Sequence, residues 1–197
     1  MSEVNYSIDR DLSEAQAFAD HLVPYVYESE LYGSIGGMFG SGSMPRLTLG
    51  GLLLRLRRLH ALEDQLTPEQ RTQLAAVDAK TENVRQEWTV HYDDKLVQEA
   101  ISRLKMIERF FDDCADDPRT CAANYPPEAM RRTIVQVIAD ALAEPNAEID
   151  QKMRKVDTML RRFTQPSDFI WASALQPAYP PDAYWWLYAM PPKTDTK

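Results

Sequence analysis

The sequence predicts an all-α fold: an elongated antiparallel bundle of about five helices with an irregular C-terminal strap rich in proline and aromatic residues. Three observations support this. All seven glycines lie between Gly33 and Gly51, so the rest of the chain lacks the residue that most weakens helix interiors. Apolar residues recur at helical spacing over most of the remainder. The tail from residue 164 instead concentrates prolines and three of the four tryptophans.

Length and composition are those of an ordinary globular protein. The 197 residues can bury a sizeable core, and 44% apolar with 26% charged residues indicates a folded chain. The first residues show no secretory signal. No run approaches the roughly 20 apolar residues of a membrane-spanning helix. With only two cysteines, these features predict a cytoplasmic protein with no membrane association.

The first helix is predicted to start at the capping box Ser13-Glu14-Ala15-Gln16. Pro24 should kink or end this helix midway. The glycine- and serine-rich stretch 33–51 follows as a hinge. This stretch lacks the Lys-Ser/Thr ending of a P-loop, so we interpret it as a mobile connection rather than a phosphate site.

A second helix should open near Thr48, with its leucines inward and its arginines, Arg58 among them, mostly outward. Thr67-Pro68-Glu69-Gln70 is the strongest helix-start signal in the chain. From there to about Cys114 no residue breaks a helix. The apolar seam slips at Tyr92–Asp94, so either one helix of about 46 residues bends there or two helices meet. We favour one long helix.

Asp116-Asp117-Pro118 should end that helix, and Pro126-Pro127 should start the next one, which Pro145 closes. Asn146 can cap a last helix whose apolar seam ends at Phe163. Short connections between helices of this kind imply antiparallel neighbours in a bundle.

Residues 1–163 are therefore predicted to form the bundle, and residues 164–197 a segment packed on it. Prolines prevent a long helix in this tail, and its aromatic rings carry too much apolar area to remain in water. Its densest cluster consists of Tyr184, Trp185, Trp186 and Tyr188. Burial of the cluster, which we favour, would attach the tail to the core. Exposure would make it a recognition surface, because tryptophan and tyrosine dominate interface hot spots.

The three histidines suggest an alternative role. His91 follows Glu87 by four residues and precedes Asp94 by three, so one helical face presents all three side chains. A metal site would also need His21 and His60 to converge on that face from other helices. The sequence has no HxxxH or ExxH pair. We therefore favour packed, hydrogen-bonded histidines and predict no cofactor, with a metal ion as the alternative.

Two further charge patterns are interpreted as surface. The acidic turn 112–117 contains Cys114, precedes Cys121, and lacks the glycine and terminal glutamate of an EF-hand loop. The two cysteines are too few for a zinc site and would pair only under oxidation. Three arginine pairs have acidic residues within reach and are typical of salt-bridged helix surface: Arg57-Arg58, Arg131-Arg132 and Arg161-Arg162.

The sequence contains no catalytic constellation, so we assign no catalytic residue. The net charge of −8 argues against nucleic acid as the main partner. The leading prediction is a non-catalytic helical protein-interaction or scaffolding protein that self-associates or docks to another protein. The alternative is a metal- or small-ligand-binding bundle centred on His91, which would include an enzyme.

Overall fold

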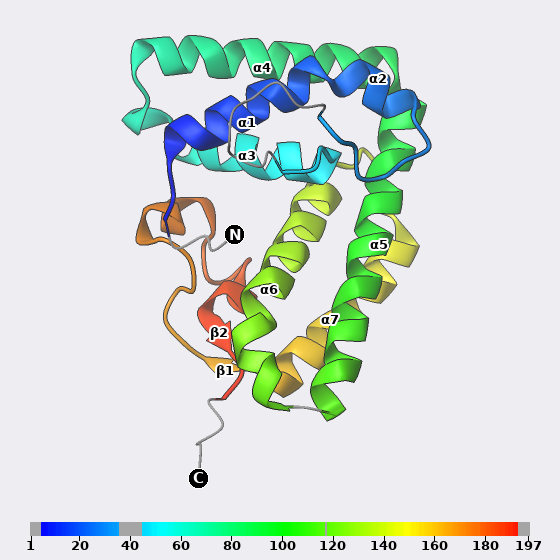
Figure 1. Cartoon of the computed structure of the whole chain (residues 1–197), viewed down its shortest axis with the longest axis vertical. Helices are drawn as coiled ribbons and strands as arrows, with labels where there is room; N and C mark the ends of the chain where they lie inside the picture. Colours follow the sequence, from blue (N-terminus) through cyan, green and yellow to red (C-terminus); the bar gives the residue numbers. More distant parts are fainter. Residues whose placement is uncertain (1–4, 36–44, 117, 193–197) are drawn as a thin grey trace. The chain divides into compact units, whose positions relative to one another are not determined.

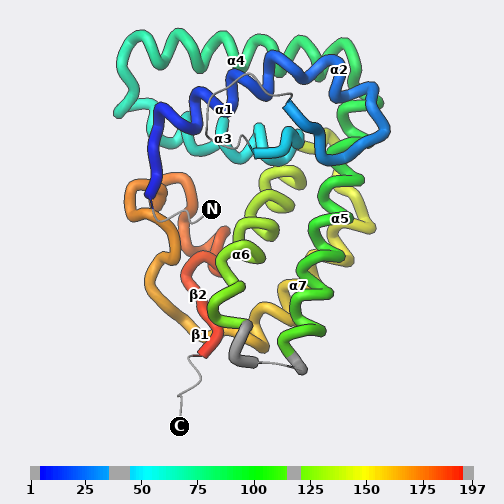
Figure 2. Tube along the Cα trace, in the orientation of Figure 1, coloured from blue at the N-terminus to red at the C-terminus, as the bar shows by residue number. Residues whose placement is uncertain are grey.

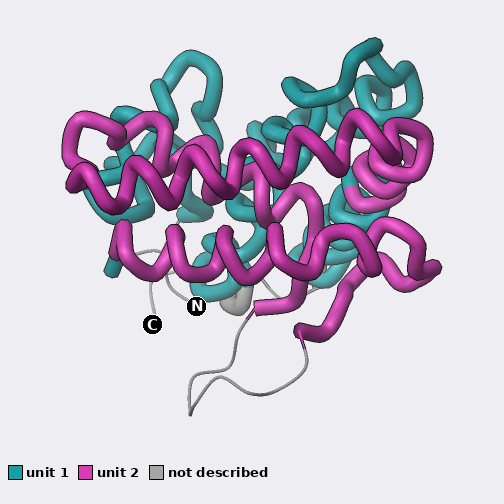
Figure 3. Tube along the Cα trace, turned by 90° about the horizontal axis from the view of Figure 1, so that it is seen from above, with its two compact units in different colours: residues 1–6, 100–197 teal, residues 7–99 magenta. Residues whose placement is uncertain are grey.

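A computed structural model of the chain describes residues 5–35, 45–116 and 118–192, apart from the side chains of residues 115–120. The chain divides into two compact units, coloured separately in Figure 3: an N-terminal unit of residues 7–99 and a C-terminal unit of residues 1–6 and 100–197. Helices dominate, which confirms the predicted all-α, helical-bundle class. The described residues form seven α-helices, more than predicted. None of these helices is long and apolar enough to cross a membrane.

The N-terminal unit contains α1 (Ile8–Asp20), α2 (Leu22–Tyr27), α3 (Leu49–Ala61), α4 (Pro68–Glu87) and the first part of α5 (Thr89–Asp116), with a 3₁₀ turn at Glu63–Gln65. Helix α1 packs against both α3 and α4 (Figure 1). The core between these helices is rich in leucine: α3 buries several leucines along its length, and α1, α2 and α4 each bury one. Among the described residues of this unit, the buried leucines are Leu12, Leu22, Leu47, Leu49, Leu52, Leu54, Leu56, Leu59, Leu62, Leu66, Leu74 and Leu96.

Capping residues define where these helices begin. The predicted starts at Thr48 and Thr67 are confirmed: Thr48 caps α3, and Thr67 with Gln70 forms a complete capping box on α4. The predicted start at Ser13 is wrong. Ser7 caps α1 instead, which places two aspartates in the first turn, where the helix dipole favours negative charge. Ser13 lies inside the helix.

One predicted helix break is observed and one helix is broken where none was favoured. The first helix breaks at His21, three residues before Pro24, as predicted, because a proline ring collides with the carbonyl four positions earlier. The favoured single helix from residue 68 to about 114 is wrong. Helices α4 and α5 meet at Trp88 (φ −121°, ψ 34°) rather than at Tyr92–Asp94. The Trp88 indole packs edge-on against Tyr27, with ring centroids 4.5 Å apart, a tertiary contact that sequence periodicity does not reveal.

Residues 36–44 of the predicted hinge lie outside the described residues. On either side of them, Gly33 and Leu47 exchange two backbone hydrogen bonds of 3.0 and 2.9 Å. The stretch ends earlier than predicted, because α3 already includes Gly50 and Gly51. A Cβ atom on Gly51 would lie 2.8 Å from the hydroxyl oxygen of the helix cap Thr48. Glycine is required there because the cap approaches the backbone so closely.

The C-terminal unit contains the remainder of α5, α6 (Pro118–Ala141), α7 (Ala147–Phe163), β1 (Gln165–Pro166), β2 (Ala189–Met190) and 3₁₀ turns at Ser173–Ala178 and Trp185–Tyr188, as the Cα trace in Figure 2 follows. The two short strands pair antiparallel. Helix α5 ends at Asp116, as predicted, and Asn146 caps α7 by accepting hydrogen bonds from the backbone N–H groups of Glu148 and Ile149.

The predicted start of a helix at Pro126-Pro127 is wrong, because α6 begins at Pro118 and runs through both prolines. An interior proline costs about 3 kcal/mol in helix stability, so other contacts must offset it. Tyr125 is fully buried, and its hydroxyl donates a 2.7 Å hydrogen bond to the carbonyl of Trp186. Trp186 in turn donates to the Thr133 hydroxyl at 2.9 Å. These contacts hold the tail on α6 and keep the helix continuous across the prolines.

Candidate functional site

The predicted aromatic cluster is divided between the core and the surface. Tyr184 and Trp186 are buried, and Trp186 is fixed by its hydrogen bond to α6. Trp185 and Tyr188 are half-buried. The consecutive residues of this 3₁₀ turn project in different directions, so one pair anchors the turn and the other reaches the surface.

Trp185 and Tyr188 line a groove of about 380 Å³, here called the tail groove. The guanidinium of Arg161 lies 4.0 Å from the centre of the Trp185 ring, within the range of a cation–π interaction. Tyr188 donates a 2.9 Å hydrogen bond to the carbonyl of Tyr179, and burial raises the pKa of its phenol. The complete lining is Arg161, Thr164, Gln165, Pro166, Pro181, Trp185, Tyr188 and Ala189.

The histidines each have separate surroundings. Nδ1 of His21 lies 2.9 Å from the carbonyl oxygen of Ala17, and Nε2 of His60 lies 3.1 Å from a carboxylate oxygen of Asp78. Across the described ranges of the chain, no group of three or more His, Cys, Asp or Glu side chains is placed to hold a metal ion. Glu87 and Asp94 are exposed. The metal prediction for these residues therefore gains no support.

His91 lies instead in an aromatic cluster, with ring centroids 5.8 Å from Tyr27 and 6.5 Å from Trp88. Two large apolar side chains here are exposed to solvent: 54% of Tyr27, which belongs to the cluster, and 71% of Val90, which precedes His91 in the chain. The cluster surrounds the junction of α4 and α5, so sequence reasoning that assumed a continuous helix there missed it.

The arginine pairs are not uniformly surface residues. Arg58 is buried and lies 3.6 Å from Asp11. Arg132 is buried too: it donates to both carboxylate oxygens of Asp157 at 2.7 and 3.0 Å and lies over the Trp186 ring. Consecutive residues differ by about 100° around a helix, so one arginine of a pair can enter the core while its neighbour stays outside. The expectation that Arg58 points outward is wrong.

The two cysteines form a disulfide. Cys114 near the end of α5 and Cys121 in α6 are bonded, with their Cα atoms 5.5 Å apart. The sequence suggested this pairing only under oxidation. The bond connects the two helices that form the second groove.

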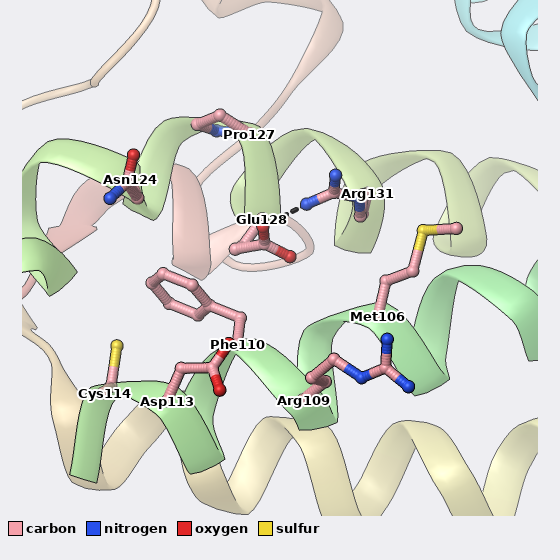
Figure 4. Close-up of a pocket in the computed structure, with 9 residues that line it drawn as sticks. All are labelled: Met106, Arg109, Phe110, Asp113, Cys114, Asn124, Pro127, Glu128 and Arg131. Carbon is pink, nitrogen blue, oxygen red and sulfur yellow. Dashed lines mark hydrogen bonds and ion pairs between the residues drawn. The ribbon is translucent and has the colours of Figure 1, made fainter. Parts of the chain in front are cut away.

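This second groove lies between α5 and α6, has a volume of about 580 Å³, and is here called the Glu128 groove (Figure 4). Each helix contributes residues at spacings i, i+3, i+4 and i+7, which is one face of an α-helix. Helix α5 provides Met106, Arg109, Phe110, Asp113 and, next to them, Cys114. Helix α6 provides Asn124, Pro127, Glu128 and Arg131.

Glu128 is the most unusual group in this groove. Only 7% of its side chain is exposed. Oε1 accepts a hydrogen bond from Arg131, whereas Oε2 is buried and has no hydrogen-bond partner. Burial raises the pKa of the Glu128 carboxyl, and the ion pair with Arg131 opposes that shift. A buried acceptor without a partner is uncommon in folded proteins and needs an explanation.

Sequence reasoning missed Glu128 because of the two prolines before it. A helix starting at Pro126 places Glu128 in a solvated first turn, with Arg131 as an ordinary surface i,i+3 partner. The signal that could have found it is the i, i+3, i+4, i+7 spacing of residues 124, 127, 128 and 131. That spacing appears only when α6 is continued back through the prolines.

The fold and these two grooves define the chain as an all-α protein with two helical units, the C-terminal of which carries both grooves. Comparison with known proteins gives no match: no family model, no curated protein and no solved structure is similar to this chain.

Proposed function

We propose that this chain is a non-catalytic protein-interaction protein that binds an extended, acidic, proline-containing segment of a partner protein in its tail groove. The observation that carries the proposal is the stack of Arg161 over the half-buried Trp185 at this groove. Trp185 and Tyr188 offer flat aromatic surfaces of the kind on which proline side chains of extended peptides dock. Tryptophan, tyrosine and arginine are also the residues that contribute most to interface affinity.

The positive charge of Arg161 favours an acidic partner segment. Among the described residues that line the tail groove, Arg161 is the only charged one, and no described residue supplies it with a carboxylate partner. Its stack on Trp185 orients the guanidinium without neutralising it. A partner carboxylate can therefore form a charge-assisted hydrogen bond with Arg161. An acidic segment fits this groove better than a basic one.

The groove is supported from behind by buried residues. Trp186 is held by Thr133 and lies against Arg132, and Tyr184 packs edge-on against Trp186 at 5.4 Å. Trp185 packs edge-on against Trp186, with ring centroids 5.8 Å apart, so its ring is oriented before a partner binds. Preorganisation of this kind reduces the entropy lost on binding.

The test uses fluorescein-labelled decapeptides of alternating glutamate and proline, with lysine–proline and glutamate–glycine decapeptides for comparison, and fluorescence anisotropy as the readout. The Glu-Pro peptide should bind most tightly. Trp185→Ala and Arg161→Gln should each weaken it by about tenfold or more, as expected for interface hot spots. Arg162→Gln is the matched control, because Arg162 is the exposed neighbour and does not line the groove.

Equal binding of the glutamate–proline and lysine–proline peptides, or no effect of Arg161→Gln, would contradict the proposal. Sedimentation velocity tests whether a second copy of the chain, rather than another protein, occupies the groove. A dimer that Trp185→Ala dissociates would assign the tail groove to a second copy of the chain and overturn the proposed acidic partner.

A further inference from the structure

The Glu128 groove has features that a simple packing defect would not require. Its volume of about 580 Å³ lies in the range of small-molecule sites, ~300–1,000 Å³. A disulfide joins its two walls at one end. A carboxylate that is more than nine-tenths buried projects from α6 toward the space between the helices, as Figure 4 shows. None of these features is needed for the tail groove, so this site is independent of the proposed function.

The carboxylate of Glu128 is held in one orientation, and only one of its two oxygens accepts a hydrogen bond. Arg131 binds Oε1 and fixes the side chain. Oε2 then has no donor in the described structure. A ligand N–H or O–H group would provide the missing hydrogen bond, and a positively charged donor would do so most strongly, because the acceptor carries charge in a poorly solvated place.

The opposite wall of the groove offers a cation. Arg109 lines the groove from α5, and Figure 4 shows its side chain running along that helix below Met106. It is exposed and has no ion-pair partner among the described residues. Its planar guanidinium suits a ligand carboxylate. Two arginines and two carboxylates line the groove: Arg109, Arg131, Asp113 and Glu128. Among the described residues of the lining these charges balance, which favours a ligand that carries one charge of each sign.

Apolar side chains supply the remainder of the surface. Phe110 lies between the two charged walls, Met106 is partly exposed beside Arg109, and Pro127 lines the α6 side. An aromatic or aliphatic ligand body can pack there, while polar groups at fixed positions orient it, as in most small-molecule sites.

We infer that the Glu128 groove binds a small zwitterion with an apolar body, of the amino-acid class. Its ammonium group donates to Oε2 of Glu128, its carboxylate pairs with Arg109, and its apolar body packs on Phe110 and Met106. A purely anionic ligand would face two carboxylates, and a purely cationic one would face two arginines. The zwitterion alone satisfies both walls.

The inference is tested by isothermal titration calorimetry on the full oxidised chain with three probes of nearly equal shape. L-Phenylalanine carries both charges, phenethylamine only the ammonium, and 3-phenylpropionate only the carboxylate. L-Phenylalanine should bind about tenfold or more tightly than either single-charge probe, because loss of one charged partner leaves a group of the site unpaired. No heat from L-phenylalanine at millimolar concentration would overturn the inference, as would equal affinity for all three probes.

Two substitutions assign the two walls. Glu128→Gln should reduce L-phenylalanine binding to the level of 3-phenylpropionate and should not weaken binding of 3-phenylpropionate itself. Arg109→Gln should reduce L-phenylalanine binding to the level of phenethylamine and should not weaken binding of phenethylamine. Arg109 is exposed and has no ion-pair partner among the described residues, so Arg109→Gln should fold normally. This variant tests the inference even if Glu128→Gln alters stability.

Glu144→Gln is the matched control, because Glu144 is exposed, follows the end of α6 and does not line the groove. Its binding of all three probes should equal that of the wild type. Uniform loss of binding in both Glu128→Gln and Arg109→Gln, regardless of probe charge, would show a general change in the groove and overturn the assignment. Arg161→Gln should not affect these probes, which separates failure of this site from failure of the tail groove.

Discussion

Glu14 in the N-terminal unit and Glu128 in the C-terminal unit are buried to nearly the same degree, with 8% and 7% of their side chains exposed. Their oxygens are used differently. Oε1 of Glu14 accepts a hydrogen bond from Arg10 at 3.0 Å, and Oε2 accepts two from Arg55. Glu128 has one arginine on one oxygen and no donor on the other.

This comparison shows that burial alone does not identify a functional carboxylate. Arg55 also donates to the carbonyl of Gly51 at 2.7 Å and lies 4.8 Å from the centre of the Phe18 ring. Glu14 therefore belongs to a closed network that joins α1 to α3. Satisfied networks of this kind stabilise and orient helices, whereas a partly satisfied one leaves a buried acceptor without a hydrogen bond, which is costly. We assign structure to Glu14 and ligand binding to Glu128 for this reason.

The largest expected effect is that of Glu14→Gln. Among the described residues, removing this charge leaves Arg55 with only Asp11, at 4.0 Å, as an ionic partner. Removal of one partner from a buried ion pair should lower the free energy of unfolding by about 3 kcal/mol, measured by urea denaturation. Glu87→Gln, on an exposed position, should change it by less than about 0.5 kcal/mol. If Glu14→Gln lowered the free energy of unfolding no more than Glu87→Gln does, Glu14 would have no structural role. The comparison between Glu14 and Glu128 would then have no basis.

Reduction of the disulfide should have the next largest effect, and it acts on the C-terminal unit alone. Cys114 and Cys121 are seven positions apart. Closing so short a loop restricts the unfolded chain by about 2–3 kcal/mol in the loop-entropy model. Urea denaturation with and without a phosphine reductant should show that difference, with two thiols per chain titrating only after reduction. Two titratable thiols in the purified, untreated protein would contradict the pairing.

The same reduction sharpens the comparison at the ligand site. The disulfide joins the helices that form the Glu128 groove, whereas the Glu14 network contains no cysteine. Reduced protein should bind L-phenylalanine less tightly than oxidised protein, because the walls of the groove are held less rigidly.

Local sequence predicted the helices whose ends carry their own signals. Thr48, the Thr67 capping box and Asn146 each satisfy backbone groups within a few residues, so a single sequence reveals them. The break at Trp88 and the continuation of α6 through its prolines depend on contacts between distant residues. Trp88 packs against Tyr27, and Tyr125 is held by Trp186. Periodicity contains no information on such partners.

The candidate sites, like the helices, could be predicted from the sequence only in part. Composition singled out the aromatic cluster in the tail, and two of its members, Trp185 and Tyr188, line a groove. Spacing could not show which members turn inward. The histidines shared only residue type, and each has its own surroundings in the structure. Glu128 was missed because Pro127, just before it, is typical of the first turn of a helix. A glutamate in such a turn is expected to be exposed, whereas Glu128 is buried.

The smallest expected effect is the pH dependence of Glu128→Gln. Burial raises the pKa of Glu128 above its ordinary value of 4.5, so the folded chain binds this proton more tightly than the unfolded chain. Stability from the neutral carboxyl is therefore fully present below pH 4.5 and is lost as pH rises through the raised folded pKa. Glutamine stays neutral throughout. The unfolding free energy of the wild type minus that of Glu128→Gln should therefore fall across this window and then level off.

Urea midpoints of the two proteins measured from pH 4 to pH 7 test this trend, and a difference that is flat or rises with pH would contradict it. The ligand provides the sharper comparison. A bound ammonium group next to Oε2 favours the ionised carboxylate, so saturating L-phenylalanine should reduce the pH-dependent fall in the wild type. It should leave Glu128→Gln unchanged, because no carboxyl titrates there. Phenethylamine should act in the same direction as L-phenylalanine, and 3-phenylpropionate, which lacks the ammonium, should not.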